Sequence, residues 1–101
     1  MPYQNTLPAA GMLTTSLTPL FTNLSGVPAE IRLIKLVNNS CADRQVNIFL
    51  NSNGFRTPIL PEKFQLKTGC IAQDEAVIQL RKDDAIDGFC DGEQSVTYII
   101  S

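Results

Sequence analysis

The chain has 101 residues, of which 44% are apolar and 18% charged, and its formal net charge is −2. These values predict one globular domain and exclude a disordered chain. The eight Lys and Arg residues are scattered along the sequence, whereas nucleic-acid binding requires clustered positive charge. No apolar run approaches the roughly 20 residues that span a bilayer. We therefore expect neither a nucleic acid nor a membrane as a partner.

The N-terminus and the cysteines indicate the compartment. The first residues, MPYQN, lack the basic start and apolar stretch of a secretory signal, so we expect synthesis in the cytoplasm. Cys41, Cys70 and Cys90 are odd in number and far apart, and the chain has no His. This predicts free, mostly buried thiols and no zinc site. The triplets at 23–25 and 38–40 match the N-glycosylation pattern, which we interpret as coincidence.

The apolar residues at the start of the chain show neither the period of a helix nor that of a strand. Residues 1–13, with Pro2 and Pro8, predict an extended arm that precedes a domain over 14–101. The stretch TTSLTPLFTN at 14–23 predicts an edge strand, because Pro19 cannot donate to a strand ladder. A turn with Gly and Pro follows at 24–28.

Residues 30–38, EIRLIKLVN, predict a single strand, because β-branched residues are frequent and the polar NNS ends it abruptly. Its apolar side chains alternate between two faces: Ile31, Leu33 and Val37 on one, Ile34 and Leu36 on the other. Apolar side chains on both faces indicate a central strand, or a strand whose second face meets another subunit.

The next strand is expected between two hairpin turns. NNSCAD at 38–43 holds side chains that bond to the backbone in turns. In VNIFLN at 46–51 the period of two points Val46, Ile48 and Leu50 toward the core, with the alternate residues facing outward. Asn53-Gly54 is the dipeptide that favours a type I′ hairpin turn. We interpret these segments as one meander.

The remaining sequence predicts further short strands. Pro58 and Pro61 indicate a loop or irregular edge at 55–61, and strands are expected at 63–67, 76–80, 85–90 and 95–101, the third of them bulged near its glycine. About seven short antiparallel strands with regular turn signals predict an all-β fold, a β-sandwich or jelly-roll-like domain.

Candidate chemistry is sparse. Without His, the usual general base and triad arrangements are excluded. Four acids, Asp83, Asp84, Asp87 and Asp91, lack the alternate spacing of a calcium loop, and we interpret them as solvated turn acids. A cation at Asp83 and Asp84 stays open. The aromatic residues fit a packed core better than an exposed stacking platform. We expect no catalytic, cofactor-binding or metal-binding residues, and no enzyme.

Several segments together resemble one family. They are SLTPLFTNLSGVPAEIRLIKLVNNSCADRQVNIFLNSNG, ILPEKFQLKTG, VIQLRKDDAIDGF and SVTYIIS. Over residues 16–101 this pattern of strands and turns resembles the short β-rich structural proteins of tailed bacteriophages. The chain departs from that pattern at Asp83, where the family usually has a glycine, and at Cys70, where an acid is common.

The resemblance implies a non-enzymatic virion protein made in the host cytoplasm. It implies most often a head-decoration (cement) protein on the capsid surface, with the major capsid protein or other virion proteins as partners. A homo-oligomer, a trimer at three-fold junctions, is then expected. A neck, tail, baseplate or fibre-associated module is the alternative within the virion. A carbohydrate-binding β-sandwich on a receptor-binding particle is the alternative from another class.

Overall fold

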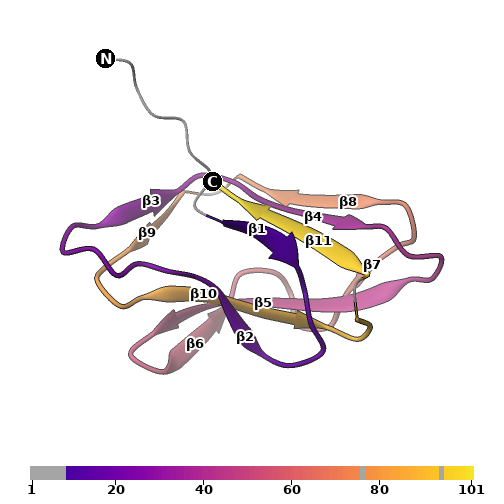
Figure 1. Ribbon diagram of the computed structural model, residues 1–101, viewed down its shortest axis with the longest axis horizontal. Coiled ribbons are helices and arrows are strands. Elements are labelled where there is room, and N and C mark those ends of the chain that lie inside the picture. Colours follow the sequence, from indigo (N-terminus) through magenta and orange to yellow (C-terminus); the bar gives the residue numbers. More distant parts are fainter. Residues whose placement is uncertain (1–8, 76, 94) are drawn as a thin grey trace, which may run out of the picture.

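Figure 1 shows the computed structural model of the protein, which describes residues 9–75, 77–93 and 95–101. All regular structure in these ranges is β-strand, which confirms the expected all-β fold. The strands number eleven among the described residues, more than the seven expected. They are β1 (Ala9–Met12), β2 (Thr18–Thr22), β3 (Ala29–Ile31), β4 (Ile34–Asn38), β5 (Arg44–Ser52), β6 (Phe55–Pro58), β7 (Phe64–Leu66), β8 (Ile71–Asp74), β9 (Ile78–Leu80), β10 (Ala85–Cys90) and β11 (Val96–Ile100).

The strands form two facing sheets and a short two-stranded ribbon (Figure 1). The four-strand sheet has the order β1-β11-β4-β8, and the five-strand sheet has the order β2-β10-β5-β6, with β7 also paired to β5. The ribbon pairs β3 with β9. The pairs β1–β11, β2–β10, β3–β9, β4–β8 and β5–β7 are nested and antiparallel. These nested pairs are those of one long hairpin folded over into two layers.

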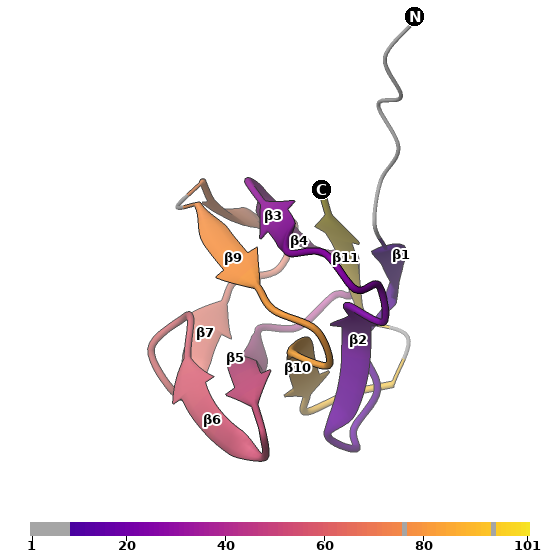
Figure 2. The same ribbon diagram turned by 90° about the vertical axis from the view of Figure 1, so that its left-hand side faces the viewer.

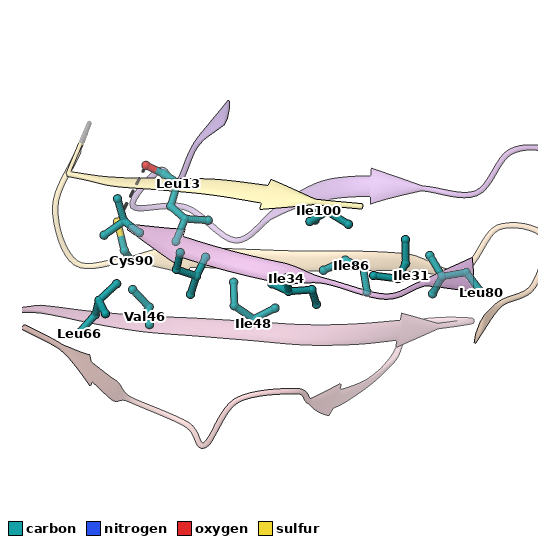
Figure 3. Close-up of a cluster of buried hydrophobic side chains, with 12 residues drawn as sticks. Leu13, Ile31, Ile34, Val46, Ile48, Leu66, Leu80, Ile86, Cys90 and Ile100 are labelled. Atoms are coloured by element: carbon teal, nitrogen blue, oxygen red, sulfur yellow. Dashed lines mark hydrogen bonds between the residues drawn. The ribbon is translucent and has the colours of Figure 1, made fainter. Parts of the chain in front are cut away.

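The core lies between the two sheets (Figure 3). Val46 and Ile48 of β5 are both 0% exposed, which confirms the inward face predicted for this strand. Leu50 is half-buried and packs against the same cluster. Burying an aliphatic side chain of this size contributes about 1.5–3 kcal/mol. The fully enclosed members of the cluster are Leu13, Ile31, Ile34, Leu36, Val46, Ile48, Leu66, Leu80, Ile86, Cys90, Val96 and Ile100.

The single strand predicted at 30–38 is wrong, because the chain breaks at Arg32 and Leu33. Both of their backbone N–H groups donate to the Ser101 carbonyl, at 2.7 and 3.0 Å. This shared acceptor shifts the alternation, so that Ile31 and Ile34 both enter the core. β3 leaves to pair with β9, whereas β4 is central between β11 and β8.

The arm expected at 1–13 needs a correction over its second half. Residues 9–12 form β1 and pair with β11 from Ala9–Ile100 to Met12–Thr97. Leu13 is 1% exposed in the core, and its N–H donates to the Val96 carbonyl at 2.9 Å. The sandwich therefore begins by residue 9, and residues 1–8 of the expected arm lie outside the described residues.

The two turns around β5 differ from each other. Asn53 and Gly54 have φ values of 55° and 82°, which is the left-handed pair that a type I′ turn requires. This confirms the predicted hairpin between β5 and β6. The segment after Asn38 is no hairpin end, because β4 and β5 belong to different sheets. It is a corner that carries the chain from one sheet to the other.

The irregularity expected in 85–90 lies at Ile86–Asp87, where β2 contributes one extra residue, Leu20. Crowding by neighbouring side chains explains why this strand has a glycine at position 88. A Cβ atom there would lie 2.8 Å from Ile48 Cδ1 and 3.0 Å from Leu20 Cδ1. The side chains of the two strands that flank β10 in the same sheet, β5 and β2, therefore crowd this position, and a side chain there would force them to shift.

Ile48→Ala is expected to lower the free energy of unfolding by about 2–5 kcal/mol, because it leaves a cavity in the core. Asn47→Ala is expected to cost only about 0.5–1.5 kcal/mol, because Asn47 lies on the other face of β5, where it is 7% exposed and its Oδ1 accepts one N–H, from Lys63 at 2.9 Å. Chemical denaturation of both variants checks the register. Equal losses would contradict it.

Gly88→Ala is expected to cost about 1–3 kcal/mol through overpacking. Gly26→Ala is the matched control, since a Cβ at Gly26 meets nothing within 4 Å. Thermal melts of the two variants measure the difference. A Gly88→Ala protein as stable as the Gly26→Ala protein would show that the Ile48 and Leu20 side chains move aside easily at this point.

Candidate functional site

The acid cluster expected to be solvated is partly buried. Asp84 is 6% exposed. Its Oδ2 accepts the Arg81 backbone N–H at 2.9 Å, and its Oδ1 accepts the Ser52 hydroxyl at 2.9 Å. The Arg81 N–H, followed by the Ser52 hydroxyl, holds the pKa of Asp84 below its ordinary value. Asp84 thus fastens the β9–β10 turn to β5.

Asp87 is buried further, at 1% exposed. Its Oδ2 accepts from Arg56 Nε and Asn51 Nδ2, both at 3.0 Å. Its Oδ1 is buried without a hydrogen-bond partner among the described residues. The interpretation of Asp84 and Asp87 as solvated acids is therefore wrong. Both charges are enclosed because an arginine and neutral donors compensate the loss of water.

The other two acids remain at the surface and apart from this pair. Asp83 is exposed, with a φ of 71°. Asp91 is exposed and faces Arg44 at 4.0 Å. The described residues contain no group of three or more His, Cys, Asp or Glu side chains arranged to hold a metal ion. The four acids are therefore structural or exposed groups and do not converge on one point.

The cysteines are free thiols, but the expectation that most of them are buried is wrong. Cys41 and Cys70 are exposed, whereas Cys90 is buried and its Sγ donates to the Gly92 carbonyl at 2.9 Å. Burial is the main cause that raises the pKa of the Cys90 thiol. Cys90 therefore acts as a small core residue. The described part of the chain contains no pocket and no helix of the length and apolarity needed to cross a membrane.

Two corners of the fold are built in the same way. In the first, Asn23 Nδ2 donates to the carbonyls of Val27 and Leu80, at 3.0 and 2.9 Å. In the second, Asn38 Nδ2 donates to the carbonyls of Ala42 and Leu66, at 2.9 and 2.8 Å. We call these the Asn23 corner (residues 23–27) and the Asn38 corner (residues 38–42).

The serine of each corner completes the repeat. The N–H and hydroxyl of Ser25 both donate to Asn23 Oδ1, at 3.1 and 2.8 Å. Ser40 bonds to Asn38 Oδ1 in the same way, at 2.9 and 2.7 Å. Asn23 and Asn38 are 3% and 1% exposed. The two glycosylation-like triplets therefore form backbone corners, and their amides are closed to a glycan in the folded chain.

The outer face of the four-strand sheet carries apolar side chains from all four strands. Met12, Thr97, Val37 and Ile71 stand side by side in one row across β1, β11, β4 and β8. The neighbouring row consists of Ala10, Ile99, Lys35 and Gln73. We call these eight residues the four-strand face.

The four-strand face is accessible and nearly free of charge. Met12 and Ile71 at its two edges are 44% and 56% exposed, and Val37 and Ile99 in its middle are half-buried by their neighbours. Lys35 is its one charged residue. A contiguous apolar surface of this kind typically marks a contact with a macromolecule. The residues at 30–38 indicated this face from the sequence, whereas the contributions of β1 and β8 were not predicted.

Among the described aromatic residues, Phe55 alone is exposed, at 76%. The others are half-buried, in agreement with the expectation that they pack. A sugar-stacking platform would need a row of exposed rings.

The chain matches no protein-family model, no curated protein and no solved structure. Its candidate site is therefore defined by its own geometry, which is the open outer face of a sheet.

Acid is expected to destabilise the protein partly through Asp84. Because the folded pKa of Asp84 lies below the ordinary value of 3.8, the unfolded chain binds more protons as the pH falls through this range, and the stabilisation present at neutral pH is lost. The stability gap between wild type and Asp84→Asn should therefore shrink below this pH. Denaturation from pH 7 downward measures it, with Asp83→Asn as the exposed control. A constant gap would contradict this.

Proposed function

We propose that the protein is a non-enzymatic structural component of a virion, in the first place a head-decoration (cement) protein that bridges capsomers. The observation that carries the proposal is the four-strand face, where five of the eight side chains are apolar and one is charged. Such a face suits a lasting contact with a capsid protein, because obligate interfaces are more apolar than transient ones. The resemblance of residues 16–101 to phage structural proteins supports the same role.

The internal use of the buried acids also supports a structural role. Asp84 accepts hydrogen bonds from Arg81 and Ser52, and Asp87 accepts them from Arg56 and Asn51. These bonds fasten strands and turns to one another. A cement protein must remain rigid while it adds buried area between neighbouring capsid subunits. In the proposed arrangement three copies associate at a three-fold junction, and the partner is the major capsid protein.

The carbohydrate-binding alternative has less support, because Phe55 is the single exposed aromatic side chain among the described residues. A tail or baseplate position remains the rival within the virion. Locating the chain in intact particles by electron microscopy distinguishes head from tail directly. Absence of the chain from purified particles would overturn the proposal altogether.

Val37→Glu is expected to abolish or weaken attachment to particles that lack the protein, by at least roughly tenfold in dissociation constant. The reason is that it places a charge in the middle of the four-strand face, where the partner would have to desolvate it. Co-sedimentation with such particles measures the effect.

Gln65→Glu is the matched control, because Gln65 is an exposed residue of β7 in the other sheet. Both variants should keep the wild-type melting temperature within a few degrees, which corresponds to about 1 kcal/mol. Attachment equal to wild type in the Val37→Glu protein would exclude the four-strand face as the contact.

A further inference from the structure

Three loops lie at the end of the sandwich that faces the viewer in Figure 2. They are the Asn23 corner, the β9–β10 turn (residues 81–84) and the β5–β6 hairpin turn. The backbone N–H of Asn23 donates to the Asp84 carbonyl at 2.9 Å, and the Ser52 hydroxyl donates to Asp84 Oδ1 at 2.9 Å. Asp84 thus ties the three loops into one rigid surface.

This surface carries large apolar side chains that are mostly exposed to solvent. Leu24 and Val27 of the Asn23 corner are 74% and 66% exposed, and Phe55 beside the hairpin turn is 76% exposed. These exposed fractions are larger than those of Met12 and Ile71 on the four-strand face. We call Leu24, Val27, Phe55 and Asp83 the loop end.

The Asn38 corner provides an internal comparison for the loop end. It makes the same side-chain hydrogen bonds as the Asn23 corner, but it has Asn39 and Ala42 where the first corner has Leu24 and Val27. The corner geometry therefore does not require apolar side chains at these two positions.

Asp83 also differs from the residue at the equivalent place beside the Asn38 corner, which is Gly69. Each corner is closed by a turn whose third residue donates its N–H to the asparagine carbonyl: Asp83 to Asn23 and Gly69 to Asn38. Their φ values are 71° and 72°. Glycine adopts this conformation freely, whereas an aspartate is strained in it. The Asp83 side chain makes no hydrogen bond or ion pair with any of the described residues, so that part of the fold gains nothing from its carboxylate.

We propose that the loop end is an interface with a second copy of this chain, related by a twofold axis. The three residues that the fold does not require are then explained together, as two apolar contacts and one charge presented at a single surface. Residues that break a local rule without benefit to the fold are expected at functional sites.

The charges at the loop end favour a second copy over other partners. Lys82 is exposed immediately beside Asp83, so both signs occur side by side. In an isologous interface residue i of one copy contacts residue j of the other and the reverse, so one such contact would pair Asp83 with the second copy's Lys82 twice. An anionic membrane would suit a purely basic surface, and here Arg56 and Arg81 already pair with Asp87 and Asp84.

This contact is independent of the virion role and of the four-strand face. The loop end lies at the strand ends, whereas the four-strand face is the broad side of a sheet (Figures 1 and 2). Both surfaces are therefore available at once, and a dimer through the loop end leaves the proposed capsid contact free.

The test replaces loop-end residues by those of the internal counterpart. Leu24→Asn with Val27→Ala installs the residues of the Asn38 corner, and Asp83→Gly installs the glycine of its turn. Sedimentation velocity of the full chain over a concentration series measures self-association. The wild type is expected to dimerise, and the double variant to raise the dimer dissociation constant at least roughly tenfold. Asp83→Gly should weaken the dimer while its melting temperature stays equal or rises.

The reverse exchange at the other corner, Asn39→Leu with Ala42→Val, is the matched control and should leave the dissociation constant unchanged. A wild type that stays monomeric at every concentration would overturn the proposal, as would a dimer that the double variant does not weaken. Binding of a monomeric wild type to phosphatidylserine vesicles, lost in the double variant, would overturn it in favour of a membrane surface.

Discussion

The fold depends on two buried asparagines, Asn23 and Asn38, at the points where the chain leaves a sheet. Each amide group donates to the carbonyl of its own corner and to the carbonyl of a distant strand, Leu80 in one case and Leu66 in the other. A buried polar group without its partners costs about 1–3 kcal/mol. The corners can therefore close only when β9 and β7 are in place, which links local turn formation to the overall topology.

The repetition of this corner gives the molecule an internal duplication. The unit β2–β3 with β9–β10 has the same connections as the unit β4–β5 with β7–β8. The sequence carries a weak trace of it, since Asn23-Leu24-Ser25 and Asn38-Asn39-Ser40 lie 15 residues apart and Gln65-Leu66 recurs as Gln79-Leu80. A search for spaced pairs of this kind, rather than for continuous repeats, would have found the signal.

The arrangement separates polar groups that serve the fold from surfaces that are open to partners. Asp84 and Asp87 are enclosed by arginine, serine and asparagine side chains, and the same contacts make the loop end rigid. The four-strand face is rigid for another reason, because β11 and β4 are held on both sides by ladder hydrogen bonds. A pre-ordered surface loses little conformational entropy on binding, so the proposed contacts need only modest areas.

The sequence alone determined what short-range chemistry controls. It predicted the all-β class, the inward face of Val46, Ile48 and Leu50, the free thiols and the turn at Asn53-Gly54, because alternation and left-handed turn residues act over a few positions. Tertiary structure decided the rest. The Ser101 carbonyl broke the strand at Arg32, β11 drew residues 9–12 into a sheet, and Arg56 allowed Asp87 to be buried. Each of these depends on a partner far away in the chain, which a local pattern does not contain.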